Sequence, residues 1–166
     1  MTSELRCFTG SKSALGLLGF LTGVVALASQ ACSEAETRGG TIDELQAATL
    51  LALQREVLDI GVFCVAVRGE EEGLQDPPPA VMRRVTEATP GVARQSECEV
   101  EPGVVWHPGV DSLAVLLVVE DSNVQEREAT VAAYWYMSGT ERQDYVCRFV
   151  RDQPWKLEGC EVVGIS

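Results

Sequence analysis

The sequence predicts an α+β fold, with an N-terminal helix packed on a curved antiparallel sheet of about five strands and a second, short helix. Two observations lead to this prediction. Apolar residues at helical spacing occur only in the first half of the chain, whereas the second half consists of alternating or wholly apolar runs separated by turn residues. Helices followed by a series of strands are typical of α+β proteins.

Residues 1–31 are predicted to be a signal peptide. Arg6 and Lys12 precede an apolar run over residues 14–28, and small residues follow at 29–31. A basic start, an apolar centre and a small-residue exit are typical of secretory leaders. The apolar run is shorter than the roughly 20 residues that a membrane span needs, although an uncleaved anchor remains an alternative.

The end of this leader resembles the lipobox of bacterial lipoproteins, in which small residues precede a cysteine. Ala31 matches the small residue before that cysteine, while Ser29 stands where leucine is usual. The resemblance implies that Cys32 is lipidated, becomes the mature N-terminus and anchors the chain to a bacterial membrane on the periplasmic side. Residues 32–40 would then be a lipidated tether. Cleavage after Ala28 or Ala31 without lipidation is the alternative, and it would give a secreted protein.

The remainder of the chain is strongly acidic. Of the 166 residues, 135 remain after the leader, which is enough for one domain, predicted over residues 41–166. This part has 24 acidic and 11 basic side chains, a net charge of −13. Because such a surface repels phosphate groups and no basic stripe occurs, nucleic acid is excluded as a partner.

Two helices are expected at the start of the domain. The first begins with a capping box, in which Thr41 is the N-cap and Glu44 lies three residues further on, and it ends near Gly61. Its apolar stripe consists of Ala47, Leu50, Leu51, Val57 and Leu58. The second follows Asp76, which is expected to cap it, and three prolines that suit a first turn. Its inner face comprises Val81, Val85 and Ala88, and Pro90-Gly91 ends it.

The strands follow from apolar and alternating patterns. Residues 61–67 predict a strand buried on both faces, and a continuation of the first helix is the alternative over so short a run. Residues 92–100 alternate and residues 101–111 form a long connection, after which residues 113–120 predict a central strand. Residues 129–137 alternate again, and residues 144–150 and 155–163 form a final hairpin. This order of elements resembles the cystatin-like and nuclear-transport-factor-like rolls.

Four cysteines lie beyond Cys32, and an even number in an exported chain predicts two disulfides. Three connectivities are possible, and the expected pairs are Cys64–Cys98 and Cys147–Cys160. A tight turn in the final hairpin would place Cys147 and Cys160 on one face as diagonal neighbours. An odd number of loop residues would place them on opposite faces, and the apolar pattern favours that second case. No C-x-x-C pair occurs, so no metal site is predicted.

Few residues are candidates for chemistry. His107 is the chain's only histidine, and we interpret it as a loop residue before Pro108 rather than a base or ligand. Tyr134, Tyr136 and Trp106 are the candidates for a ligand pocket, with core packing as the alternative. The carboxylates at residues 70–72 are interpreted as a solvated loop. No catalytic motif appears, so no catalytic residue and no cofactor are predicted.

Two functions are therefore compatible with the sequence. The first is an envelope-tethered, non-enzymatic binding or interaction module with an unidentified protein or small-molecule partner. The second is a small-molecule-binding or enzymatic roll that uses a cavity between helix and sheet. A cavity lined by convergent polar groups would favour the second function, and an interior filled by leucine, valine and tryptophan would favour the first.

Overall fold

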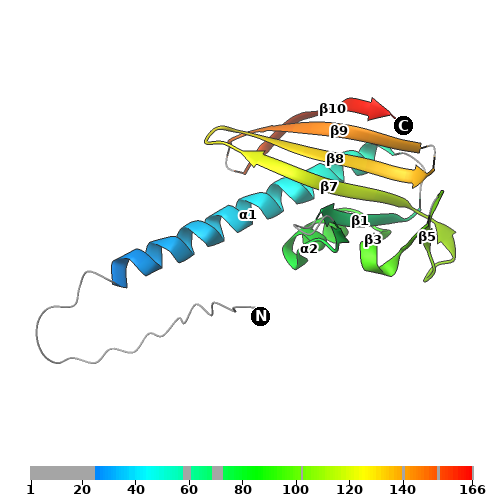
Figure 1. Cartoon of the computed structure of the whole chain (residues 1–166), viewed down its shortest axis with the longest axis horizontal. Helices are drawn as coiled ribbons and strands as arrows, with labels where there is room; N and C mark the ends of the chain where they lie inside the picture. Colours follow the sequence, from blue (N-terminus) through cyan, green and yellow to red (C-terminus); the bar gives the residue numbers. More distant parts are fainter. Residues whose placement is uncertain are drawn as a thin grey trace, which may run out of the picture. The chain divides into compact units, whose positions relative to one another are not determined.

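The computed structural model describes residues 25–57, 61–68, 73–101, 103–139, 141–152 and 154–165, with side chains described from residue 41 onward. The chain divides into two units, Met1–Gly40 and Thr41–Ser166. Helix α1, Val25–Glu56, runs through the division between them. The second unit contains the strands and helix α2, Pro79–Ala88, so the protein is a mixed α+β fold (Figure 1).

Helix α1 begins earlier than predicted. Thr41 lies within the helix, so the capping box does not mark its start, and residues 33–40 are helical. Alanine, glutamate and glutamine before Gly39 favour helix strongly enough to offset two glycines, each of which costs about 1 kcal/mol. Glu44 has another partner, because its carboxylate accepts a hydrogen bond from the backbone N–H of Trp155 at 3.2 Å. The helix ends at Glu56, before the predicted Gly61, and Leu58 lies outside the described residues.

The principal sheet has seven strands and is mixed, whereas about five antiparallel strands were expected. Its order is β10-β9-β8-β7-β1-β2, and β3 also pairs with β1. Strand β1 is parallel to β3 and β7, and the remaining pairs are antiparallel. Helix α2 lies in the connection between β1 and β3, and such a crossover allows two strands to pair in parallel. The seven strands are Phe63–Arg68 (β1), Leu74–Gln75 (β2), Val92–Arg94 (β3), Val115–Val124 (β7), Glu128–Ser138 (β8), Glu141–Val150 (β9) and Lys156–Ile165 (β10).

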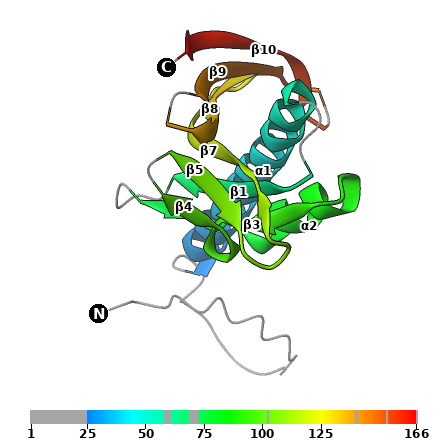
Figure 2. The ribbon, with the colours of Figure 1, turned by 90° about the vertical axis from the view of Figure 1, so that its right-hand side faces the viewer.

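A second, smaller sheet has the order β4-β5-β6. Its strands are Glu99–Glu101 (β4), Val104–His107 (β5) and Ser112–Leu113 (β6). Figure 2 shows β4 and β5 close to β1 and β3. The region predicted as a long connection, residues 101–111, therefore contains a strand, because valine and tryptophan at 104–106 favour extended structure.

The core has two layers, one on each side of the principal sheet. On the first side α1 and α2 pack against alternate residues of β1 and β7, such as Val65 and Leu117. On the second side Val105 of the small sheet packs against the intervening residues, such as Ala66 and Leu116. Strands β1 and β7 are therefore buried on both faces, as their uninterrupted apolar runs predict.

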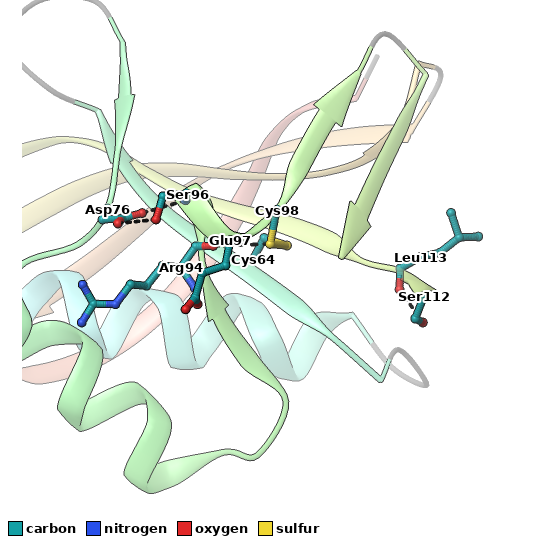
Figure 3. Close-up of a disulfide and its surroundings, with 8 residues drawn as sticks. All are labelled: Cys64, Asp76, Arg94, Ser96, Glu97, Cys98, Ser112 and Leu113. Carbon is teal, nitrogen blue, oxygen red and sulfur yellow. Dashed lines mark hydrogen bonds between the residues drawn. A yellow bond between two sulfur atoms is a disulfide. The ribbon is translucent and has the colours of Figure 1, made fainter. Parts of the chain in front are cut away.

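Asp76 does not cap α2, which begins after Pro78 and has no side-chain cap. Its carboxylate instead accepts hydrogen bonds from the backbone N–H and the hydroxyl of Ser96, at 2.8 and 2.7 Å (Figure 3). Ser96 lies 20 residues further along the chain, so the sequence around Asp76 does not reveal that its carboxylate binds there. Val81 and Val85 are buried as predicted, but Ala88 is exposed and Met82 is buried instead.

The predicted strand over residues 92–100 is interrupted. A 3₁₀ turn over Gln95–Glu97 separates β3 from β4, so the alternation from Val92 to Val100 does not define one face. Glu97 closes this turn by accepting a hydrogen bond from the backbone N–H of Arg94 at 2.8 Å. Gly91 precedes β3 with φ of +77°, and a Cβ there would lie 2.4 Å from the carbonyl oxygen of Gly61. Only glycine fits this turn.

The two disulfides are the pairs that the sequence predicts. Cys64–Cys98 joins β1 to the start of β4, and Cys147–Cys160 joins β9 to β10. The hairpin loop is odd, because Val150 pairs with Lys156 and Phe149 with Leu157. By itself that parity would place the two cysteines on opposite faces. A β-bulge at Glu158 inserts one extra residue, so Cys147 and Cys160 face each other with Cα atoms 4.0 Å apart.

Candidate functional site

The three aromatic residues predicted to line a pocket do not lie together: Tyr134 and Tyr136 are on the principal sheet and Trp106 is on the small sheet. Tyr134 and Tyr136 extend from β8 on the side of the sheet that faces away from the helices, whereas their neighbours Ala133 and Trp135 face the helices. The hydroxyl of Tyr136 accepts a hydrogen bond at 3.1 Å from the backbone N–H of Gly103, in the turn between β4 and β5. Tyr136 therefore connects the two sheets rather than lining a cavity beside α1.

Tyr134 belongs to a cluster of charged side chains that sequence reasoning missed. The guanidinium of Arg142 lies over the Tyr134 ring, 3.9 Å from its centroid, and donates hydrogen bonds of 2.9 and 2.6 Å to Asp144. Arg68 donates to Glu120 at 3.1 Å on the same side of the sheet. These residues come from β1, β7, β8 and β9. The pairing of Tyr134 with Asp144 across β8 and β9 follows only from strand register.

Electrostatics make this cluster unsuitable for proton transfer near neutral pH. Burial raises the pKa of Tyr134, and the charges of Arg142 and Arg68 only partly oppose that effect. Hydrogen bonds from the arginines to Glu120 and Asp144 raise the pKa of Arg68 and Arg142. The phenol therefore stays neutral and both guanidiniums stay charged and paired. Neither the neutral phenol nor the charged guanidiniums can act as a general base in this state.

A second polar group of side chains faces α1. Trp135 donates from its indole N–H to the Tyr145 hydroxyl at 3.3 Å, and that hydroxyl donates to Gln143 at 2.9 Å. Burial raises the pKa of Tyr145, although the bond from Trp135 lowers it. On the helix, Thr49 Oγ1 and both amide atoms of Gln54 are buried without a hydrogen-bond partner among the described residues. The remaining buried side chains of the interface are largely apolar and include Leu45, Leu50, Leu53, Val65, Leu117 and Phe149.

His107 lies at the end of β5 and not in a loop. Its Nδ1 atom is buried and has no hydrogen-bond partner within the described ranges. The His107 ring lies beside Gly109, and a Cβ added at Gly109 would lie 2.8 Å from the Cε1 atom of that ring. No carboxylate or nucleophile bonds to this ring among the described residues. No cluster of three metal-binding side chains occurs in the described part of the chain, and residues 70–72 lie outside that part.

The outer surface of the small sheet carries apolar side chains, of which Leu113 is exposed and Val104 and Trp106 are half-buried. Val105 is fully buried against the principal sheet, so its neighbours Val104 and Trp106 point to the opposite side. Trp106 lies on β5, directly opposite Glu99 of β4 on one side and Leu113 of β6 on the other. Leu113 is 57% exposed, and Figure 3 shows it projecting away from the disulfide and its surroundings.

One shallow depression is lined by Glu126, Arg127, Val150 and Arg151 at the strand turns. Its described lining consists of one carboxylate, two guanidiniums and one apolar side chain, with no aromatic ring among them. Cys32, the predicted lipidation site, lies within α1 at a position where side chains are not described. Among the described residues, no helix is long and apolar enough to cross a membrane.

Comparison with protein-family models, curated proteins and solved structures gives no match for this chain. The resemblance of its element order to the cystatin-like rolls therefore stays a prediction.

Proposed function

We propose that this chain is an envelope-tethered lipoprotein, with its lipid on Cys32, and that its domain is a non-enzymatic binding or interaction module. The leader supports the tether: a basic start, an apolar run and small residues lead to Cys32. The lipid would hold the domain on the periplasmic side of a bacterial membrane.

One observation carries the choice of an interaction module over an enzyme. The space between α1 and the sheet is filled by side chains such as Leu50, Leu53 and Phe149, each at most 1% exposed. The polar side chains that do converge, around Tyr134, form ion pairs, and the pKa values of Tyr134, Arg68 and Arg142 are all shifted away from neutrality. A filled interior and a paired surface cluster favour recognition by the exterior of the domain.

The tether is tested by labelling cells with a fatty acid analogue. Wild type is expected to incorporate the label, and Cys32→Ala is expected to lose it. Cys7→Ala is the matched control, because Cys7 precedes the apolar run and should not affect labelling. Equal labelling of wild type and Cys32→Ala would contradict the lipoprotein proposal.

A second candidate function has one observation in its favour. Thr49 and Gln54 place unpartnered polar atoms in the interface between α1 and the sheet, where a small polar ligand would satisfy them. If this interface binds a ligand, replacing Thr49 by valine should weaken that binding and leave the domain no more stable. If the interface is only core, the same substitution should stabilise the domain.

A further inference from the structure

The outer surface of the small sheet combines apolar and acidic side chains in two cross-strand rows. Glu99, Trp106 and Leu113 form the first row, and Glu101 and Val104 form the second. Side chains directly opposite each other on neighbouring strands lie about 5 Å apart at Cβ. We call these five residues the Trp106 face.

The two carboxylates of the Trp106 face have no ion-pair or hydrogen-bond partner among the described residues. Within the described ranges, the ion pairs join Arg68 to Glu120, Arg142 to Asp144 and Arg148 to Glu161, and none includes Glu99 or Glu101. Glu99 and Glu101 are both exposed, and no hydrogen bond to either side chain occurs in this part of the structure. In the three ion pairs that the described residues form, an arginine neutralises the neighbouring carboxylate. The Trp106 face therefore presents a local negative charge beside apolar surface.

An indole ring beside two carboxylates suits a cationic side chain. A guanidinium or ammonium group gains from stacking on tryptophan, and it gains more from a charge-assisted hydrogen bond to a carboxylate. The aliphatic stem of arginine or lysine would pack on Leu113 and Val104. An exposed apolar area with a polar rim is typical of protein interfaces, and tryptophan is enriched among their energetically dominant residues.

The chain's charge argues against the other occupants of such a face. The protein carries a net charge of −12, so an anionic membrane surface or a second copy of the chain would be repelled. The free edge of β10 is a weaker candidate for docking. It carries exposed Val162, Val163 and Ile165, but two register shifts distort the edge, and such bulges hinder addition of a strand.

We infer that the Trp106 face is a docking site for a basic protein segment, with an arginine or lysine side chain of that segment on Trp106 and Glu99 and an apolar neighbour on Leu113. The inference rests on the proposed role as an interaction module and names the surface and the partner's chemistry.

The test is a selection of binders from a random dodecapeptide library against the full-length chain in detergent micelles. Selected peptides are expected to be enriched in arginine or lysine next to an apolar residue. Their affinity should fall at least about 10-fold in Trp106→Ala and about 5-fold in Glu99→Gln and in Leu113→Ser. Replacing the peptide's basic residue by glutamine should abolish the difference between wild type and Glu99→Gln, and higher salt should weaken binding.

Two matched controls lie elsewhere on the domain. Val163→Ser alters a side chain that is 62% exposed, compared with 57% for Leu113, and Glu128→Gln removes an exposed carboxylate from β8. Both should leave affinity within about 2-fold. If Trp106→Ala is destabilised, Glu99→Gln and Leu113→Ser decide the result, because both change exposed groups.

Several results would overturn the inference. Peptides without basic residues, or no enriched peptide at all, would refute the partner's chemistry. Peptides that bind Glu99→Gln and Leu113→Ser as well as wild type would show an interaction module with a different docking surface. Quenching by brominated lipid in proteoliposomes that disappears in Trp106→Phe would identify a membrane occupant. A dimer that dissociates in Leu113→Ser would identify a second copy. Failure of the proposed tether would be seen separately, in the fatty-acid labelling of Cys32.

Discussion

Loss of the Cys64–Cys98 disulfide should destabilise the domain more than loss of Cys147–Cys160. The first links residues 34 positions apart and the second residues 13 apart. If a disulfide acts mainly by restricting the unfolded chain, these separations correspond to about 4 and about 3 kcal/mol at 25 °C. Cys64 and Cys98 are buried, at 0% and 8% exposure, and Cys147 is fully buried as well, so alanine at either pair leaves a small cavity that adds about 1 kcal/mol to each loss.

The assay is urea unfolding of the full-length chain, comparing wild type with Cys64→Ala/Cys98→Ala and with Cys147→Ala/Cys160→Ala. A loss of about 5 kcal/mol is a large share of the 5–15 kcal/mol that stabilises a typical domain. Because Cys98 immediately precedes β4, hydrogen exchange should accelerate most in the small sheet. A smaller loss from the first pair than from the second, or a loss below about 1 kcal/mol, would refute this reasoning.

Three further predictions concern single positions. Thr49→Val should raise the free energy of unfolding, measured by chemical denaturation, by about 1 kcal/mol, because it removes a buried hydroxyl that has no partner among the described residues. An unchanged or lower free energy of unfolding would contradict this. Deleting Glu158 should preserve the Cys147–Cys160 disulfide in non-reducing peptide maps, because the deletion removes only the bulge residue; a different linkage would disprove the register. Because the pKa of Tyr134 is raised by burial, its neutral form contributes stability that is complete below pH 10 and lost as pH rises above that value. Unfolding measured between pH 8 and 11 should show a smaller alkaline loss in Tyr134→Phe than in wild type, and equal losses would count against the assigned burial effect.

Local sequence determined the elements whose side chains follow an uninterrupted pattern. The apolar runs around Val65 and Leu117 predicted strands buried on both faces, and they are buried on both faces. The alternation in β8 predicted that Val131 and Ala133 face one side and Tyr134 the other, as they do. These patterns are reliable because side chains on a strand alternate between its two faces regardless of which strand lies next to it.

Tertiary structure decided whatever depends on a partner distant in the chain. Asp76 resembles a helix cap in sequence, but its carboxylate binds Ser96, and Glu44 likewise bonds to Trp155. The odd loop of the final hairpin would by itself place Cys147 and Cys160 on opposite faces. A bulge at Glu158 brings them to the same face, and the alternation of residues did not reveal that bulge. The charged cluster around Tyr134 and the Trp106 face arise from strand register across four and three strands, respectively. Register is set by the packing of whole strands, so side chains that meet across a sheet carry no shared signal in a single sequence.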